Sequence, residues 1–256
     1  MKRIIAVANQ KGGVGKTTTN VNLATCLAQA GKRVLVADLD PQGNTTSGFG
    51  IDKHTVEYSI YSLLTGDAYL EQVALDVGIE GLQLLPANIE LSGAEIELID
   101  QPEREYKLRD IFSHAKYLYD YILIDCPPSL NLLTLNALCA ADSILVPIQC
   151  EYYALEGLTQ LMHTVDLVQK RLNPRLTIEG VVFTMYDSRT NLSAQVVQEV
   201  RDNLSAHIYE SIIPRNVRLS EAPSHGLPIT MYAPNSKGAE AYMSLAREVI
   251  RKQDVI

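Results

Sequence analysis

The chain of 256 residues has no apolar run that approaches the roughly 20 residues of a transmembrane helix. It has no proline-, glycine- and serine-rich linker, no internal repeat and no low-complexity tract. The first apolar segment begins within three residues of Met1, so that no room is left for a signal peptide. These absences predict a single domain over residues 1–256, located in the cytoplasm, because α/β folds of this size are commonly undivided.

Cysteine is scarce, and the four cysteines show no Cys-x-x-Cys spacing. In a reducing compartment, isolated cysteines are typical of small core side chains and not of disulfides or metal ligands. The alternative is an iron–sulfur cluster that bridges two subunits, which would need paired thiolates from each chain. The residues concerned are Cys26, Cys126, Cys139 and Cys150.

A glycine-rich segment with two lysines follows the first apolar run and precedes a helical pattern. Its glycines leave N–H groups free for phosphate oxygens, Lys16 can reach the β- and γ-phosphates, and the Thr17 hydroxyl can bind Mg²⁺. The match is to a variant, because the strict phosphate-loop pattern has glycine in place of Gln10. A strand-to-helix turn without a ligand is the alternative. The residues expected to bind nucleotide here are Lys11, Gly12, Gly13, Val14, Gly15, Lys16, Thr17 and Thr18.

The first of the two lysines, Lys11, lies at the entrance of the loop. Lys16 already accounts for the lysine that a phosphate loop requires, and Lys11 has no obvious phosphate of its own subunit to contact. Its charge is therefore available to a nucleotide held by a second subunit.

Strand and helix patterns alternate along the whole chain. Runs of valine, isoleucine and leucine without strict alternation predict strands covered on both faces, at residues 4–8, 33–38, 82–86, 121–125, 143–148, 178–184 and 208–213. Helical patterns fall at residues 17–30, 90–99, 107–117, 130–141, 155–172, 192–204 and 237–251. This order predicts a doubly wound, mostly parallel α/β sheet with helices on both faces, as in P-loop NTPases. Ligands of such sheets bind beyond the carboxyl ends of the strands.

Aspartates stand at the ends of two of these predicted strands. Asp38 and Asp40 lie on one side of an extended segment, and Asp125 ends the run Tyr121–Asp125. We expect Asp125 to hold a water of the Mg²⁺ shell, because Mg²⁺ keeps several waters and takes few protein ligands. Asp40 is the candidate for orienting the attacking water, and Asp38 for positioning Lys16 or the waters of the metal. For each aspartate, the alternative is a turn or a helix cap.

Six motifs together resemble the ParA/Soj family of DNA-partitioning ATPases, and the likeness runs from the first strand to the last helix. The resemblance implies an ATP-dependent sandwich homodimer in which Lys11 contacts the nucleotide of the partner. It implies non-specific binding of double-stranded DNA by that dimer, and a weak ATPase stimulated by a ParB-type partner on DNA. The motifs are Lys11–Thr18, Asp38–Asn44, Asp125–Ser129, Gln149–Gly157, Thr184–Asn191 and Ile213–Ser224.

The same resemblance implies roles for single residues. Thr17 ligates Mg²⁺, Asp40 serves the hydrolytic water together with the charges of Lys11 and Lys16, and residues like Pro214 and Asn216 lie against the nucleotide base. Because the chain begins at its first strand, it is similar to the short, chromosomal members, which lack the N-terminal DNA-reading extension of larger plasmid relatives.

The net charge of −8 is unevenly distributed along the chain. Residues 1–150 hold 11 basic and 18 acidic side chains, whereas residues 151–256 hold 11 and 12. A local basic face for DNA can therefore form in the second part, and a dimer would double it. Arg189 and Arg218 lie in motifs that resemble DNA-contacting positions of the family. Arg247, Arg251 and Lys252 of the last helix are the further candidates, with an ordinary solvated helix face as the alternative.

Three other classes of protein share such a phosphate loop. A membrane-associated division-site ATPase of the MinD type needs a C-terminal amphipathic helix, and the tail, residues 246–256, brings only Val249, Ile250 and Ile256 loosely together. We therefore expect no membrane binding. A ligase that activates a carboxylate needs a second substrate pocket. A nucleotide-gated binding module without turnover is the third alternative, against which Asp40 speaks.

Overall fold

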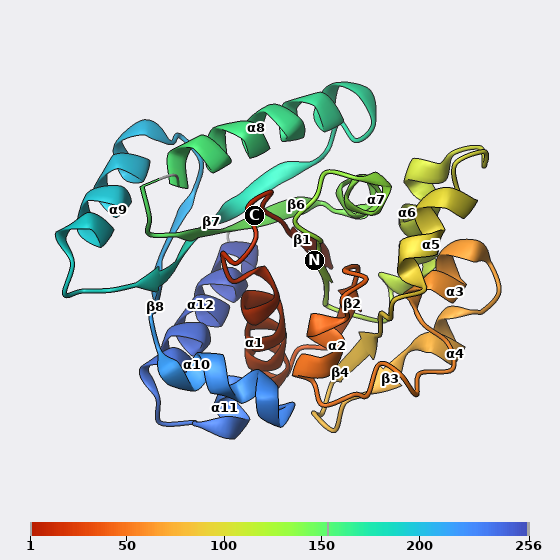
Figure 1. Ribbon diagram of the computed structural model, residues 1–256, viewed down its shortest axis with the longest axis horizontal. Coiled ribbons are helices and arrows are strands. Elements are labelled where there is room, and N and C mark those ends of the chain that lie inside the picture. Colours follow the sequence, from red (N-terminus) through yellow and green to blue (C-terminus); the bar gives the residue numbers. More distant parts are fainter. Residues whose placement is uncertain (1, 153, 255–256) are drawn as a thin grey trace.

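The computed structural model describes residues 2–152 and 154–254, which form one sheet of eight strands between two layers of helices (Figure 1). The strand order is β3-β4-β2-β5-β1-β6-β7-β8, and only the β3–β4 pair is antiparallel. The predicted doubly wound, mostly parallel fold is confirmed. The strands are β1 Arg3–Val7, β2 Val34–Asp38, β3 Leu75–Asp76, β4 Leu82–Leu85, β5 Tyr121–Asp125, β6 Ser143–Gln149, β7 Thr177–Tyr186 and β8 Ile208–Pro214.

Helices cover both faces of the sheet. One face carries α1 Lys16–Gln29, α2 Asn44–Gly48, α10 Val217–Glu221, α11 Ile229–Tyr232 and α12 Lys237–Asp254, together with the 3₁₀ helix η2 Ala222–His225. The other face carries α3 Ile60–Thr65, α4 Leu70–Val73, α5 Leu91–Glu97, α6 Lys107–Ala115, α7 Leu132–Ala140, α8 Ala154–Arg171 and α9 Asn191–Asn203, with the 3₁₀ helix η1 Arg104–Tyr106.

The central strands β1, β2 and β5 are almost entirely apolar, and both of their faces are buried. In β1, Ile4 and Ala6 pack into the cluster of α3 to α9, and Ile5 and Val7 pack into the cluster of α1 and α12. A strand of this kind has no polar face, which explains the continuous apolar runs of the sequence.

The prediction found every strand except β3 and placed the longer helices within a few residues of their observed ends. It missed β3, the five short helices α2, α3, α4, α10 and α11, and both 3₁₀ turns. Such elements contain two to six residues, too few for a hydrophobic period to be recognised. That residues 1–256 make up one domain stays a prediction.

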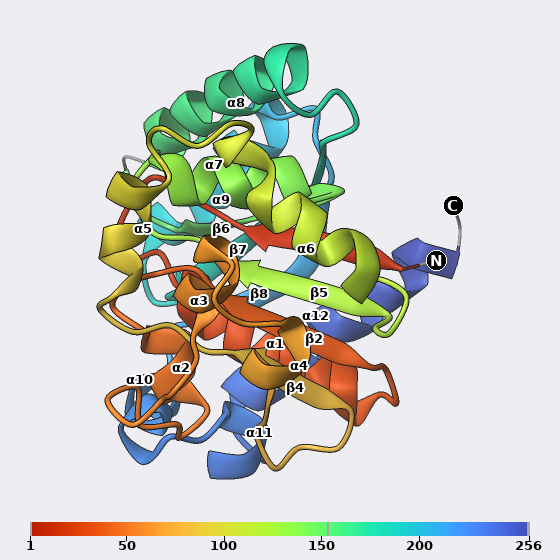
Figure 2. The same ribbon diagram turned by 90° about the vertical axis from the view of Figure 1, so that its right-hand side faces the viewer.

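The parallel strands bring their carboxyl ends to one edge of the sheet. Asp125 of β5 lies in register with Val7 of β1 on one side and with Asp38 of β2 on the other. In Figure 2 the strands point to the left, toward α5 and α10, whereas α12 ends on the right. The loop after β1 and the predicted aspartates therefore meet at the carboxyl edge, as expected for this fold.

Candidate nucleotide site at the carboxyl edge

The loop between β1 and α1 presents a row of free backbone donors. Among the described residues, no N–H of residues 12–18 donates a hydrogen bond, whereas the N–H of Lys11 donates to Oδ1 of Asn9 (3.0 Å). The loop lines a cavity of about 700 Å³ together with Asp40, Asn44 and Pro128. Free donors at the N-terminus of α1, with the positive end of its dipole, make an anion site.

Hydrogen bonds to three other elements hold the loop in place. Nδ2 of Asn9 donates to the carbonyl of Pro147 in β6 (2.8 Å), and Oγ1 of Thr184 in β7 donates to the carbonyl of Val14 (2.8 Å). Gln10, which replaces the usual glycine, donates through Nε2 to Oγ1 of Thr164 in α8 (2.8 Å). These anchors cannot be recognised from the sequence alone, since their partners are far away along the chain.

The two lysines of the loop have different surroundings. Lys16 is buried, and its Nζ donates to the carbonyl of Lys11 (3.3 Å). Burial lowers the pKa of Lys16, and the charges of Asp125 and Asp40 oppose that shift. Lys11 is partly exposed, and its Nζ lies 3.1 Å from Oε2 of Glu151. Lys16 therefore points into the site of its own chain, whereas Lys11 is held at the rim by an acid that follows β6.

Asp125 is the buried acid at the centre of the site. The hydroxyls of Thr17 and Thr45 donate to its Oδ2 at 2.7 and 2.8 Å, while its Oδ1 has no hydrogen-bond partner. Burial raises its pKa, and the two threonine hydrogen bonds counteract the rise. A buried carboxylate oxygen without a partner requires an explanation. A hydrated Mg²⁺ beside Thr17 would supply the missing donor, so the residues fit the expected metal.

The other two aspartates differ in exposure. Asp38 is fully buried, and its Oδ2 accepts from both the N–H (2.8 Å) and the hydroxyl (2.7 Å) of Thr46 in α2. Burial, followed by the charge of Asp125, raises its pKa. Among the described residues, no hydrogen bond or ion pair joins Asp38 to Lys16, and the role of Asp38 in positioning Lys16 or the waters of the metal stays a prediction. Asp40 lines the cavity, and its Oδ1 accepts from the N–H of Gln42 (2.9 Å).

A second cavity of about 310 Å³ adjoins the first and shares Gly15, Thr18 and Met185 with it. Both residues expected beside the base, Pro214 and Asn216, line this second cavity. Oδ1 of Asn216 accepts from the N–H of Arg218 (2.8 Å) and so caps α10. Among the described residues, its Nδ2 donates no hydrogen bond and could serve a ligand in the cavity.

The four cysteines are buried, which confirms that they are core side chains. Burial raises the pKa of Cys139 to about 11 and those of Cys26 and Cys150 to about 12, and it also raises the pKa of Cys126. Such thiols stay protonated at neutral pH and are poor metal ligands.

The arginines predicted to contact DNA lie at the same edge as the phosphate loop. Arg189, 83% exposed, follows β7, and its guanidinium binds Asp187 through Nε (2.8 Å) and Nη2 (2.7 Å). Arg218, 59% exposed, lies in α10 and donates to Glu221 (2.9 Å). The exposed Arg218–Glu221 pair contributes only about 0–1 kcal/mol, so the Arg218 guanidinium remains available to a phosphate. The Arg189 pair is bidentate, and the Arg189 side chain is still largely exposed.

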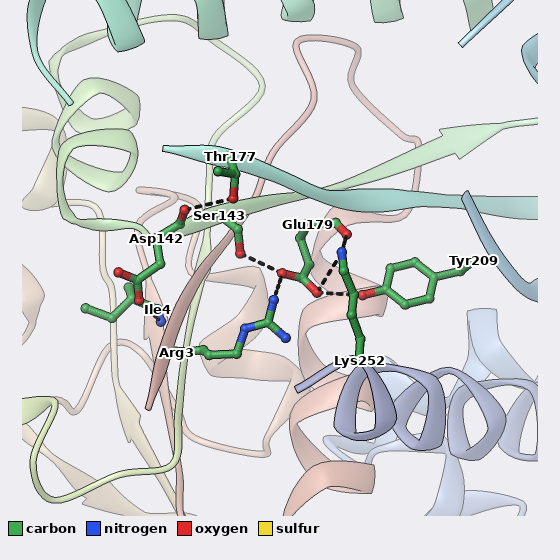
Figure 3. A network of polar contacts seen from close by, with 8 residues as sticks. All are labelled: Arg3, Ile4, Asp142, Ser143, Thr177, Glu179, Tyr209 and Lys252. Carbon is green, nitrogen blue, oxygen red and sulfur yellow. Dashed lines mark hydrogen bonds and ion pairs between the residues drawn. The ribbon is translucent and has the colours of Figure 1, made fainter. Parts of the chain in front are cut away.

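The candidates on α12 lie elsewhere. Arg247 and Arg251 line a groove between α12 and β8 that also contains Glu210, Glu240 and Glu248. Lys252 belongs to a buried network at the amino ends of the strands, the edge opposite to the phosphate loop (Figure 3). Its Nζ lies 3.5 Å from Oε1 of Glu179, which is 1% exposed. The charge of Lys252 thus has a buried counter-ion, and its contact with DNA stays a prediction.

The chain matches known proteins along its whole length. A family model described as an AAA domain matches residues 2–178. The sporulation initiation inhibitor protein Soj of Bacillus subtilis (strain 168) is 58% identical over 97% of this chain and 98% of the relative. The chromosome partitioning protein ParA of Myxococcus xanthus (strain DK1622) is 54% identical over 98% and 88%.

Solved structures show the same fold. A Mycobacterium smegmatis protein named cobyrinic acid a,c-diamide synthase, with bound ADP and magnesium, superimposes with a TM-score of 0.86. The two chains are 39% identical, and the match covers 99% of this chain and 96% of the other. The extent of the match to Soj and ParA, together with the doubled-lysine loop at the carboxyl edge, shows that the chain belongs to the ParA/Soj family of chromosome-partitioning ATPases.

Proposed function

We propose that this protein is a DNA-partitioning ATPase that binds ATP and Mg²⁺ in the cavity of about 700 Å³ and then pairs with a second copy. The ATP-bound dimer binds double-stranded DNA without sequence preference, in the cytoplasm on the nucleoid. A ParB-type protein on DNA stimulates a weak ATPase and so releases the dimer. The observation that carries this proposal is the row of free N–H groups of residues 12–18 beside the unpaired Oδ1 of Asp125.

Nucleotide binding rests on the loop. The free N–H groups bind phosphate oxygens, and Lys16 contributes a buried positive charge within the same cavity. The base occupies the adjoining cavity against Pro214 and Asn216. Because the two cavities share Gly15 and Thr18, a single nucleotide can extend through both.

Hydrolysis needs a positioned water and compensation of charge. Mg²⁺, when bound, would offset the negative charge of the phosphates. Thr17 would ligate it directly, and Asp125 would hold one of its waters through the unpaired Oδ1. Asp40, fixed by the N–H of Gln42, orients the attacking water and accepts its proton. The transferred group gains electrostatic stabilisation from Lys16 and the loop N–H groups.

The position of Lys11 explains why two copies of the chain would form a dimer. Its ammonium group lies at the rim, outside the row of free donors, and is held by the partly exposed Glu151. We propose that Lys11 leaves Glu151 when two copies meet and binds the nucleotide of the partner. Each active site is then complete only in the dimer, and hydrolysis destroys the contact that holds the dimer together.

The alternatives fit less well. No helix within residues 2–152 and 154–254 is long and apolar enough to cross a membrane. Val249 is fully buried and Ile250 packs against the same cluster, so neither is free to anchor the chain to a lipid surface, and Ile256 lies outside the described residues. A ligase is favoured only by the printed name of the 39% identical mycobacterial relative, whereas Soj and ParA are 58% and 54% identical.

The experiment that tests the proposal measures DNA retention on a biosensor with ATP, ADP or no nucleotide. We expect strong retention only with ATP. Lys16→Ala serves as the control and should abolish it, because the loop loses a charged hydrogen-bond donor worth roughly 1.5–3 kcal/mol. Equal retention in all three conditions would contradict ATP-gated DNA binding, which neither alternative requires.

A further inference from the structure

A bulge at the end of β7 lies directly behind the phosphate loop. Phe183 pairs with Ile212 and Tyr186 with Pro214, so that two residues of β7, Thr184 and Met185, oppose a single residue of β8. Met185 has a φ of 51°, which is rare for a residue other than glycine and costs conformational energy. Bulges of this kind redirect side chains and are frequent beside active sites.

The Thr184 side chain faces the loop and is buried with it. Its hydroxyl donates to the carbonyl of Val14 (2.8 Å), and the two residues are 2% and 1% exposed. A Cβ placed on Gly15 would lie 3.7 Å from Cγ2 of Thr184, so the threonine also backs the next residue of the loop. This contact joins positions 170 residues apart in the sequence.

The direction of the Val14 carbonyl determines where the next N–H points. In a trans peptide the C=O and the N–H point in opposite directions. A Val14 carbonyl turned toward β7 therefore directs the Gly15 N–H away from β7, and Gly15 is one of the residues that line the phosphate cavity. In a regular helix the same carbonyl would accept from the N–H of Thr18, which here donates no bond among the described residues.

We infer that Thr184 is a positioning residue of the phosphate loop: its hydroxyl fixes the Val14–Gly15 peptide and keeps the N–H groups of Gly15 and Thr18 free for phosphate. This inference rests on the proposed nucleotide binding. The strain at Met185 is the cost of placing the hydroxyl at this point. Thr184 lines the second cavity but not the cavity of about 700 Å³, and it has no role in the chemistry itself.

A pair of substitutions separates the hydroxyl from the shape of the side chain. Thr184→Val keeps the branched side chain and removes the hydroxyl, whereas Thr184→Ser keeps the hydroxyl. Calorimetric titration with Mg·ADP should give about fivefold weaker binding for Thr184→Val, the equivalent of ~1 kcal/mol for one hydrogen bond. Thr184→Ser should bind within about twofold of the unmodified protein, and both variants are titrated well below their unfolding temperatures.

If Thr184 had a purely structural role, its substitution would not change how the Gly15 amide resonance responds to Mg·ADP. In the unmodified protein and in Thr184→Ser, the Gly15 amide resonance should move downfield when Mg·ADP binds, because this N–H then donates to a charged oxygen. In Thr184→Val the shift should be smaller. If Thr184→Val does not fold, Thr184→Ala takes its place, and the Gly15 shift of the unmodified protein still tests the geometry.

Three results would overturn the inference alone. The first is parental affinity of folded Thr184→Val in a protein that binds Mg·ADP, and the second is an equal loss of affinity in Thr184→Ser. An unmodified protein that binds Mg·ADP without movement of the Gly15 resonance would also overturn it. Failure of the unmodified protein to bind Mg·ADP at all would instead overturn the proposed function, and this inference with it.

Discussion

Asp38, Asp40 and Asp125 are side chains of one type at one edge of the sheet, but their different surroundings give them different chemical roles. Asp38 and Asp125 are buried and accept hydrogen bonds from threonines, whereas Asp40 lines the cavity. Asp40→Ala should therefore lower ATP turnover by at least about a hundredfold, the lower end of the usual contribution of general-base catalysis. Nucleotide affinity should persist, since the water is oriented mainly in the transition state.

Turnover and affinity of this variant are measured by phosphate release and by equilibrium titration. Asp40→Asn is the matched variant, because it can still accept from the Gln42 N–H but cannot take a proton. It should be as slow as Asp40→Ala, and both should accumulate as ATP-bound dimers in sizing chromatography. Hydrolysis of ATP by either variant at the parental rate would remove Asp40 from the mechanism.

Lys11 and Glu151 offer a second test at the level of single residues. Both side chains are partly exposed, so their ion pair contributes at most about 1 kcal/mol. Glu151→Gln should therefore lower the ATP concentration needed for dimerisation by up to about fivefold, since Lys11 no longer has to leave an acid. Lys11→Ala should bind ATP as a monomer and fail to dimerise.

Sizing chromatography across an ATP series measures both effects, and Glu156→Gln, an exposed acid in the first turn of α8, is the control. The assignment of Lys11 to the partner's nucleotide would be wrong if Lys11→Ala lost ATP binding as completely as Lys16→Ala.

Local pattern predicted the loop, the three aspartates and their common edge. A phosphate loop is a continuous segment, and strand ends can be recognised from apolar runs. The anchors could not be predicted in the same way. Thr184 contacts Val14 across 170 positions, and Glu151 contacts Lys11 across 140. In the sequence, Lys252 is one of several basic residues of the last helix, and only the fold shows that it pairs with Glu179. Such contacts depend on tertiary packing, which a single sequence does not reveal.

At the scale of elements, the network around Glu179 fastens α12 to the amino ends of β1, β6 and β7 (Figure 3). The Glu179 carboxylate pairs with Arg3 and Lys252 and accepts from the hydroxyls of Ser143 and Tyr209, each at 2.8 Å. Burial alone would raise the pKa of Glu179. The two cations and the hydroxyl donors outweigh burial and lower it.

Glu179→Gln should destabilise the protein by roughly 3 kcal/mol at pH 7, because it leaves the charges of Arg3 and Lys252 without a counter-ion. A carboxylate with a lowered pKa stabilises the folded state above its ordinary pKa of 4.5, and this contribution is lost as the pH falls through the folded-state value. The difference in the free energy of unfolding between variant and parent should therefore be largest at pH 7 and decrease below pH 4.5.

Urea unfolding at several pH values measures this difference. Glu199→Gln, an exposed acid on α9, is the control and should change stability by less than about 0.5 kcal/mol at any pH. If the difference in unfolding free energy between Glu179→Gln and the parent stayed constant down to pH 3, the network would not act through the charge of Glu179.

On the scale of the whole molecule, net charge and DNA binding have to be reconciled. The protein carries a net charge of −8, yet Arg189 and Arg218 are exposed at the edge where a partner would sit over the nucleotide. A twofold dimer repeats both arginines, so a basic surface can form on one side of an acidic protein. Long-range repulsion from the remaining acids is screened beyond about 8 Å at physiological salt, which leaves local phosphate contacts to dominate.

Arg189→Ala and Arg218→Ala should each weaken binding to DNA of any sequence without changing ATP affinity or dimerisation. Each lost phosphate contact flattens the plot of log affinity against log salt by roughly 0.9, and a dimer that loses two contacts should show about twice that change. Sequence preference should not change, because phosphate contacts carry no base information.

The measurement uses the ATP-bound Asp40→Ala dimer, so that turnover does not interfere. Arg175→Ala, an exposed arginine just before β7 at the opposite edge, is the matched control and should leave the slope unchanged. If neither Arg189→Ala nor Arg218→Ala altered slope or affinity, the DNA surface would have to lie elsewhere, with Arg247 and Arg251 as the next residues to test.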